Sequence, residues 1–181
     1  MEIIKNKKKF FIFSLSGIVL FFMLFIALFK ANGYILNDTS SFPVGIYKVT
    51  KQENYKKGDL VSFCAPKNKT IKKLMLYGFA SPNSTCKDSV PILLKKIVAL
   101  ENSKIEIDKN KIYINGVLQE KSTVFLVGRG GNILEEQSNQ IIQKGMFWAM
   151  SDYNERSYDS RYFGQIPLEN IKGKAVPIFI W

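Results

Sequence analysis

The stretch Asn-Asp-Thr-Ser-Ser-Phe-Pro-Val-Gly-Ile-Tyr at residues 37–47 is the most informative segment of this 181-residue chain. Pro43 and Gly45 predict a stiff turn, and the turn carries Ser41 as a candidate nucleophile. A serine needs a base, and the chain has no histidine, which excludes a Ser-His-Asp triad. The common alternative is a lysine that burial has deprived of its charge. The turn therefore predicts a serine enzyme if the chain supplies such a lysine.

A long uncharged segment precedes this turn. Residues 10–29 contain no charged side chain, and a helix of that length, at about 1.5 Å per residue, spans the roughly 30 Å of a bilayer's hydrocarbon core. A lysine cluster in the basic tail at 1–9 predicts that this end stays in the cytoplasm. A cleaved signal peptide is the alternative, but its apolar region usually runs to about 7–15 residues. We therefore expect a transmembrane anchor at 10–30 and an extracytoplasmic domain at 31–181.

The composition argues against nucleic-acid binding. The net charge is +11, but the lysines that contribute to it are spread along the chain. Only three arginines, the usual readers of base edges, are present. Attraction to an anionic membrane surface explains the same charge. Cys64 and Cys86 either form one disulfide outside the cytosol or remain free as small buried groups. Two thiols without histidine cannot supply the usual four zinc ligands, so we expect no metal and no cofactor.

Beyond the anchor, the pattern predicts a mainly β domain of short strands and turns. Asn115–Gly116 predicts a type I′ hairpin turn, because both residues accept a positive φ. Residues 65–90 predict a long loop in which 71–76 forms a short helix or strand, and residues 133–143 are expected to be loop-like or weakly helical. The expected strands are residues 45–50, 59–63, 92–100, 104–107, 111–114, 117–118, 124–127, 146–150 and 175–181.

Two adjacent lysines interrupt the apolar strand at residues 92–100. Alternation along a strand sends Lys95 and Lys96 to opposite faces, so one of them can be pushed inward. Burial penalises an ammonium ion and lowers its pKa, which would supply the base that Ser41 lacks. The alternative is a pair of edge lysines that protect the sheet from aggregation, and these residues taken alone favour that interpretation.

The densest polar stretch, residues 151–164, follows the apolar strand at 146–150. Asp159 and Arg161 could form an ion pair that fixes this loop, and Ser157 could hydrogen-bond a nearby amine. A solvated surface loop is the alternative. The sequence Gly-Arg-Gly-Gly at residues 128–131 lacks the spacing and the lysine of a P-loop, and it predicts a turn.

In this order, the segments resemble the type I signal peptidases, serine–lysine proteases of membrane surfaces, and especially the TraF-type conjugative-transfer signal peptidases. Residues 37–47 are similar to the Asn-x-Thr/Ser-x-Ser-x-Pro-x-Gly-Leu-Tyr segment of that family, which assigns the nucleophile to Ser41 rather than Ser40. Residues 94–99 are similar to the segment whose first lysine is the base, which assigns that role to Lys95. Further similar segments are Gly-Asp-Leu-Val at 58–61, Cys86 with Pro-Ile-Leu-Leu-Lys at 91–95, and Ser-Tyr-Asp-Ser-Arg-Tyr-Phe-Gly at 157–164.

The chain departs from the family pattern at two places. Ser151–Asp152 stands where Gly-Asp is usual before the last segment, and Glu101–Asn102 replaces the Gly-Asp after the lysine segment. Both lie outside the dyad, so they concern loop geometry more than catalysis.

The resemblance implies a signal-peptidase-like β domain behind one N-terminal transmembrane helix. The protein would cross a bacterial inner membrane once, with its catalytic domain in the periplasm. Lys95 would activate Ser41, and the oxyanion hole would consist of the Ser41 N–H and the Thr39 hydroxyl. Ser157 would orient the lysine amine, and the Asp159–Arg161 pair would support that loop.

We therefore expect a serine endopeptidase of the signal peptidase I type that removes leader peptides from exported precursors, in particular conjugative pilin subunits. Its expected partners are precursors with small residues before the cut and the lipid bilayer, with no nucleic acid. A general signal peptidase is the alternative within the same chemistry. A non-catalytic anchored β domain that binds components of a secretion apparatus is the alternative of another class.

Overall fold

A computed structural model describes residues 2–128, 133–134 and 137–181, with side chains from residue 16 onward. The chain divides into two compact units, Met1–Ile35 and Leu36–Trp181.

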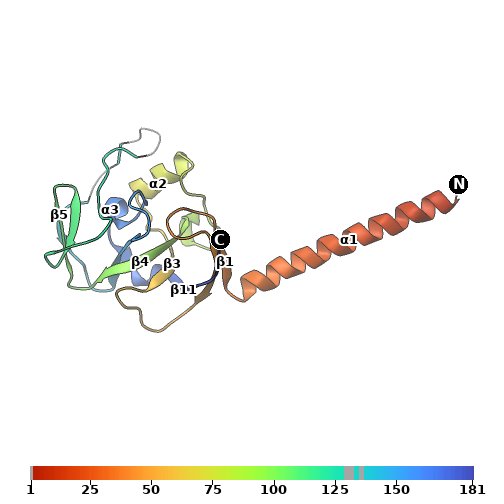
Figure 1. The fold of residues 1–181 in the computed structure, drawn as a ribbon, viewed down its shortest axis with the longest axis horizontal. Helices are drawn as coiled ribbons and strands as arrows, with labels where there is room; N and C mark the ends of the chain where they lie inside the picture. The colour runs from red at the N-terminus through yellow and green to blue at the C-terminus, as the bar shows by residue number, and fades with distance from the viewer. Residues whose placement is uncertain (1, 129–132, 135–136) are drawn as a thin grey trace. The chain divides into compact units, whose positions relative to one another are not determined.

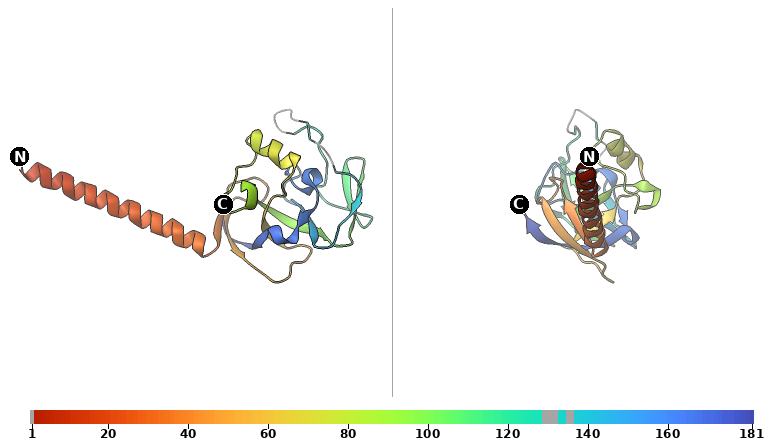
Figure 2. Two further views of the ribbon diagram at one scale, coloured as in Figure 1. Left: turned by 180° about the vertical axis from the view of Figure 1, so that it is seen from behind. Right: turned by 90° about the vertical axis from the view of Figure 1, so that its right-hand side faces the viewer.

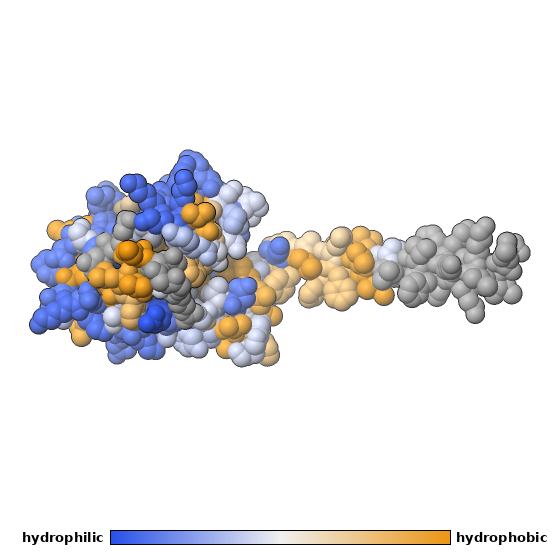
Figure 3. Space-filling view, turned by 90° about the horizontal axis from the view of Figure 1, so that it is seen from above, coloured by the Kyte–Doolittle hydropathy of each residue, from blue (hydrophilic) through white to orange (hydrophobic). Residues whose placement is uncertain are grey.

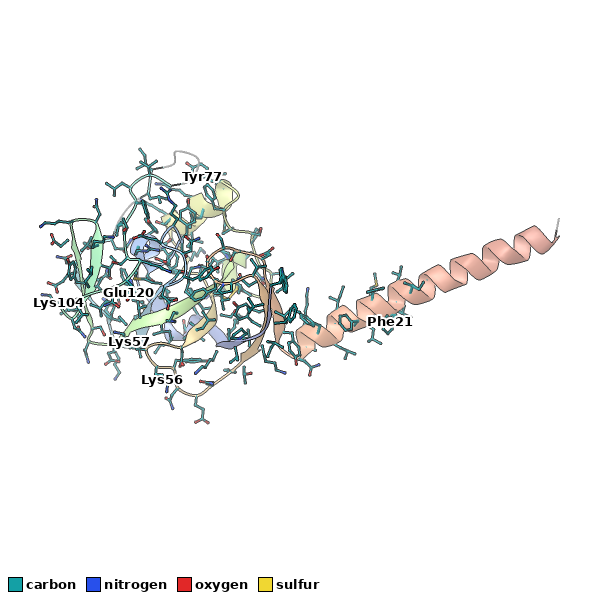
Figure 4. All side chains as sticks on the ribbon, viewed as in Figure 1. Phe21, Lys56, Lys57, Tyr77, Lys104 and Glu120 are labelled. Atoms are coloured by element: carbon teal, nitrogen blue, oxygen red, sulfur yellow. A yellow bond between two sulfur atoms is a disulfide. The ribbon has the colours of Figure 1, made fainter. Side chains whose placement is uncertain are left out.

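The first unit is essentially one helix, α1 (Glu2–Ala31). Its described side chains are largely apolar and exposed, as the space-filling view shows (Figure 3). Phe21, for example, projects away from the helix axis and is 65% exposed (Figure 4). Within the described residues, none of the helices has both the length and the apolar content that crossing a membrane requires. The predicted anchor at 10–30 is not supported by this finding, and the side chains of residues 1–15, with the basic tail, lie outside the described part.

From Tyr34 onward the chain forms two sheets whose registered strand pairs are all antiparallel (Figure 1). The larger sheet has the order β1-β2-β11-β3-β4-β9-β10 and the smaller one the order β7-β6-β5-β8. The strands of the larger sheet are β1 (Tyr34–Asn37), β2 (Gly45–Thr50), β3 (Leu60–Cys64), β4 (Ile92–Leu100), β9 (Met146–Met150), β10 (Ile166–Pro167) and β11 (Ile171–Ile180). Those of the smaller sheet are β5 (Lys104–Asp108), β6 (Lys111–Ile114), β7 (Val117–Leu118) and β8 (Gln140–Ile141).

Short helices lie in the connections between strands of the second unit. They are α2 (Lys69–Leu76), α3 (Ser160–Phe163) and the 3-10 turns η1 (Lys87–Ser89) and η2 (Leu168–Asn170). Asn68 caps α2 by accepting a hydrogen bond from the Ile71 N–H at 3.0 Å, and it donates to the Phe163 carbonyl at the end of α3 at 2.9 Å. Helix α2 accordingly lies next to α3 in the views from front and back (Figures 1 and 2).

Strand β9 separates two hydrophobic cores because both of its faces are buried. Phe147 and Ala149 belong to the cluster around β3 and β4, whereas Trp148 and Met150 belong to the cluster against the smaller sheet. A strand buried on both faces reads as a continuous apolar run, which is what Met-Phe-Trp-Ala-Met is. This rigid strand leads directly into the polar loop at 151–159.

Most of the expected strands are confirmed, and five have the predicted bounds. The Asn115–Gly116 turn is confirmed by φ angles of 52° and 77°. Residues 71–76 belong to helix α2, which resolves the choice left open there, and the last strand begins at Ile171 rather than at 175. The strands with the predicted bounds are residues 45–50, 92–100, 111–114, 117–118 and 146–150.

The strand expected at 124–127 is wrong. The Phe125 N–H donates to the Tyr162 hydroxyl at 3.0 Å, and Val127 makes only an isolated bridge to Ile133. The Val124 N–H donates to the Asn110 carbonyl, and the Leu126 carbonyl accepts from the Leu134 N–H, so the segment bonds to separate partners instead of to one continuous ladder. Residues 133–143, expected to be loop-like or weakly helical, include the two-residue strand β8. The Gly-Arg-Gly-Gly turn falls mostly on residues outside the described part of the chain.

Cys64 and Cys86 are joined by a disulfide with a Cα–Cα distance of 5.7 Å. The bond ties the end of β3 to the far end of the 65–90 connection. Asp59, in the Gly-Asp-Leu-Val segment, is buried at the start of β3, where it accepts from the Lys56 N–H at 3.0 Å and pairs with Lys174 at 2.6 Å. Both features stabilise the frame around the central strands.

Candidate active site

The turn that carries Ser41 is organised by the buried side chain of Asn37 at the end of β1. The Asn37 amide nitrogen donates to the carbonyls of Thr39, Phe42 and Pro43 at 3.0–3.1 Å. Its Oδ1 accepts from the N–H and the hydroxyl of Thr39 at 3.3 and 2.8 Å. One asparagine therefore closes the turn from both of its ends.

Gly45 joins the turn to the sheet. A Cβ at this position would lie 2.2 Å from the Phe179 carbonyl oxygen of β11, so only glycine allows the two backbones to approach. The hydroxyl of Tyr47, which is 2% exposed, donates to the Pro43 carbonyl at 2.8 Å. The C-terminal side of the turn is thus seated on the central sheet.

The remaining two carbonyls of the turn are bound by the loop that follows β9. The Ser151 hydroxyl donates to the Ser41 carbonyl at 2.5 Å, and the Asn154 amide donates to the Ser40 carbonyl at 3.1 Å. Every carbonyl from residue 39 to residue 43 consequently accepts a hydrogen bond from a side chain. Two segments more than 100 residues apart in the sequence are fastened together at the candidate nucleophile.

The Ser41 side chain is half-buried against this loop. Its Oγ lies 3.4 Å from the Ser157 Oγ, which donates to it. In the part of the chain that the structure describes, the Ser41 N–H donates to no acceptor. The nucleophile therefore carries a free backbone donor beside its hydroxyl, as an oxyanion hole requires.

Lys95 lies inside the protein, in β4 opposite Val61 of β3, and is 3% exposed. Burial lowers the pKa of its amine from 10.5 to about 8, an effect that the carboxylate of Asp159 opposes and the guanidinium of Arg161 reinforces. Among the described residues, the amine makes neither an ion pair nor a hydrogen bond, including one to Ser41. About half of the amine is therefore a free base near pH 8, well below the pH at which an ordinary lysine loses its proton.

The Lys96 side chain points to the opposite face of β4, as alternation along a strand predicts. It forms an exposed ion pair with Asp152. The two lysines are therefore separated by the sheet, and the inward one is Lys95.

Asp159 and Arg161 form an ion pair in which both side chains are fully buried, with two contacts of 2.8 Å. The Asp159 carboxylate also accepts from the Ser151 N–H at 3.1 Å. The guanidinium donates in addition to four backbone carbonyls at 2.7–3.3 Å, those of Lys121, Thr123, Glu155 and Ser157. A buried charge pair with all donors satisfied rigidifies its surroundings, here the loop that binds the Ser41 turn.

The structure brings Ser41 against the segment that carries Ser157, Asp159 and Arg161, and two placements differ from the implied roles. The Ser157 hydroxyl contacts Ser41 rather than the Lys95 amine. The Thr39 hydroxyl, implied as an oxyanion donor, donates to Asn37. Within the described residues, no group of three acidic, cysteine or histidine side chains could hold a metal ion.

Comparison with known proteins places this chain in a family. The family described as "Signal peptidase, peptidase S26" matches the chain over residues 8–181. The chain belongs to this signal peptidase family. It is a peptidase, and both the buried Lys95 and the turn that carries Ser41 lie in the matched region.

Relatives of this signal peptidase include conjugal and plasmid transfer proteins. A conjugal transfer protein TraF from Agrobacterium fabrum is 32% identical over 149 residues, 82% of this chain and 83% of that protein. A plasmid transfer protein TraF from Escherichia coli is 28% identical over 160 residues, 85% of this chain and 89% of that protein. A solved signal peptidase I from Enterococcus faecalis has a TM-score of 0.42 and 22% identity, covering 69% of this chain and 98% of that one.

Three residues of this signal peptidase site were missed from the sequence: Asn37 as the organiser of the turn, and Ser151 and Asn154 as its partners. Asn37 opens the Asn-x-Thr/Ser segment, a signal that was available because asparagine side chains commonly bind the backbone of turns. Ser151 was visible as a departure from the family's glycine. Only the fold shows that it contacts Ser41.

Proposed function

We propose that the protein is a membrane-anchored serine endopeptidase that removes leader peptides from exported precursors by means of a Ser41–Lys95 dyad. The observation that carries the proposal is the burial of Lys95, with its pKa near 8, in a protein that has no histidine. Ser41 is the serine whose turn is bound to the loop containing Asp159, and that carboxylate interacts electrostatically with Lys95.

The chemistry follows from these positions. The neutral Lys95 amine takes the proton of Ser41, whose Oγ attacks the scissile carbonyl carbon. The oxyanion accepts a hydrogen bond from the Ser41 N–H, and the Thr39 hydroxyl becomes a second donor when it turns from Asn37. Protonated Lys95 then passes its proton to the leaving amine as the peptide bond breaks. A water, deprotonated by the same amine, attacks the acyl carbon, and the ammonium returns the proton to the Ser41 Oγ as the ester bond breaks and the acid leaves.

Ser157 and the buried ion pair have supporting roles in this proposal. Ser157 holds the Ser41 hydroxyl in place through the contact at 3.4 Å, and it can pass to the lysine amine when Ser41 turns toward its substrate. Asp159 and Arg161 keep the loop rigid, and the Asp159 charge limits how far burial lowers the pKa of Lys95.

Substrates are proposed to be precursors of conjugative pilins or related transfer proteins. The support is the naming of several relatives as conjugal or plasmid transfer proteins. An anchor at residues 10–30 would keep the site at the outer surface of the cytoplasmic membrane. It is supported by the uncharged run at 10–29 and by the exposure of the apolar side chains at 18–26.

The test is mass spectrometry of pilus and secreted proteins from cells carrying wild-type protein or Ser41→Ala. We expect unprocessed precursors of transfer proteins to accumulate with Ser41→Ala, which removes the nucleophile and little else. Accumulation of many unrelated precursors would indicate a general signal peptidase. Unchanged processing, with Ser41→Ala present at wild-type levels, would contradict the proposed enzyme and favour a binding role.

A further inference from the structure

We propose that Asn154 and Ser151 are positioning residues that aim the Ser41 N–H at the oxyanion, an inference that rests on the proposed function. Neither side chain has to touch the substrate. Each binds a backbone carbonyl next to Ser41, and together they fix the two peptide planes that meet at the nucleophile.

Asn154 acts on the peptide unit that contains the proposed donor. The Ser40 carbonyl and the Ser41 N–H belong to one planar trans peptide, so they point in opposite directions. The Asn154 amide donates to that carbonyl at 3.1 Å, and to the Ser40 hydroxyl at 3.2 Å. Holding the oxygen on one side of the plane determines where the N–H points on the other. The hydrogen bond also polarises the peptide and strengthens its N–H as a donor.

Ser151 acts on the next peptide unit. Its hydroxyl donates to the Ser41 carbonyl at 2.5 Å, so the planes on both sides of the Ser41 Cα are held. With both planes held, the two backbone dihedrals of Ser41 are held as well, and so is the direction of its Cβ. The hydroxyl and the backbone donor therefore keep a constant relation to each other.

The Ser151 side chain is itself locked in place. It is fully buried, and its Oγ accepts from the N–H groups of Tyr153 and Asn154 at 3.2 and 2.9 Å. Because the Oγ already accepts two hydrogen bonds, its own proton is directed at the Ser41 carbonyl. The Ser151 N–H is bound by Asp159, so the rigidity of the buried ion pair reaches the nucleophile through this residue.

Two features make this arrangement specific to the chain. Glycine, usual at position 151 in the family pattern, has no hydroxyl and could not form the contact with Ser41. The Ser41 N–H, moreover, is left without an acceptor in the described part of the chain, while all five carbonyls from 39 to 43 are bound by side chains. The turn therefore leaves the Ser41 N–H available as a donor, while its carbonyls are all bound by side chains.

The variant Asn154→Asp isolates the proposed contact. The Asn154 Oδ1 accepts from the Arg156 N–H at 2.9 Å, and aspartate keeps that acceptor and the same shape. It replaces the NH₂ group that donates to Ser40 with a carboxylate oxygen that cannot donate, and it adds one negative charge, which Ser151→Ala does not. Ser151→Ala removes the second contact. Asn139→Ala is the matched control, because it deletes an asparagine-to-backbone hydrogen bond, from the Ile107 N–H at 2.7 Å, in the smaller sheet.

The readouts are the kcat and KM of the full-length chain in detergent, with a peptide carrying alanines before the cut, and the inhibition constant of the corresponding peptide boronic acid. The boron binds the Ser41 oxygen, and its hydroxyl occupies the oxyanion position. Removing an oxyanion donor outright costs roughly 10²–10³-fold in kcat, so misdirecting one should cost less, about 10- to 100-fold. We expect Asn154→Asp and Ser151→Ala each to lower kcat. In each variant the inhibition constant of the boronic acid should rise by about the same factor as kcat falls, with KM changed less than about threefold.

The outcomes separate this inference from the proposed function. Loss of cleavage in Ser41→Ala, together with wild-type kcat in folded Asn154→Asp and Ser151→Ala, would overturn the positioning role alone. A loss in Ser40→Ala as large as that in Asn154→Asp would assign the effect to the Ser40 hydroxyl and overturn it as well. Cleavage that persists in Ser41→Ala would overturn both proposals. Circular dichroism confirms that each variant is folded, and Ser151→Ala carries the same test if Asn154→Asp does not fold.

Discussion

The two faces of strand β4 place adjacent lysines in opposite surroundings. On the inner face, Lys95 is 3% exposed near the buried Asp159–Arg161 pair. On the outer face, Lys96 forms a solvent-exposed ion pair with Asp152. The same residue type, one position apart, is therefore a weakened base on one face and an ordinary surface cation on the other. The contrast shows that the lowered pKa of Lys95 comes from its environment and not from the residue type.

The largest expected difference between the faces is in activity. Lys95→Met removes the proposed base, and a positioned acid–base group contributes roughly 10²–10⁴-fold to rate. We expect kcat for peptide cleavage to fall by that order. The matched change on the outer face, Lys96→Met, should keep kcat within about twofold. Equal losses in the two variants would show that the faces do not differ in function.

Stability should separate the two ion pairs. Arg161→Met leaves the Asp159 carboxylate buried without its partner, and breaking a buried pair in this way costs about 3–5 kcal/mol. Asp152→Asn breaks the exposed pair with Lys96 and should cost about 0–1 kcal/mol. Urea unfolding followed by circular dichroism measures both. A small loss for Arg161→Met would show that the pair is not the rigid support of the loop.

The burial of Lys95 should itself destabilise the fold. The folded pKa, about 8, lies below the unfolded value of 10.5, so below pH 8 the folded state must hold a buried charge. At about 1.4 kcal/mol per pH unit, the cost is on the order of 3 kcal/mol. Lys95→Met should therefore raise the free energy of unfolding by about that amount at pH 7.

The sign of this effect can be followed with pH. Between pH 8 and 10.5 the unfolded wild-type chain binds the proton that the folded chain has lost, so wild-type stability rises across this window. The advantage of Lys95→Met should shrink accordingly and disappear above pH 10.5. A stability difference that is constant from pH 7 to 10.5 would mean that Lys95 is not desolvated.

The pH dependence of activity should also report the titration of Lys95. Since the neutral amine is the active form, kcat/KM should rise about tenfold per pH unit on the acid side and level off near pH 8. Lys96→Met should leave the midpoint of this limb in place. A limb that moves with Lys96→Met would assign the titration to the outer face.

Local patterns account for much of the fold. The bounds of β2, β4 and β9 follow from apolar alternation or from a continuous apolar run between turn residues, and Asn115–Gly116 determines its own hairpin because the backbone angles are a property of those residues. The strand predicted at 124–127 fails because its backbone groups bond to separate partners, among them the Tyr162 hydroxyl, which lies far along the sequence and accepts from the Phe125 N–H. Local propensity cannot anticipate such a partner.

The site divides in the same way. The sequence by itself determined that a serine on a stiff turn needs a lysine as its base, and that Lys95 and Lys96 face in opposite directions, because histidine is absent and strands alternate. Only the tertiary structure decided which lysine is buried, since that depends on what packs against each face of β4. It also decided that Ser151 and Asn154 bind the carbonyls on either side of the Ser41 nitrogen and Cα, because those contacts join segments more than 100 residues apart and leave no periodic trace in the sequence.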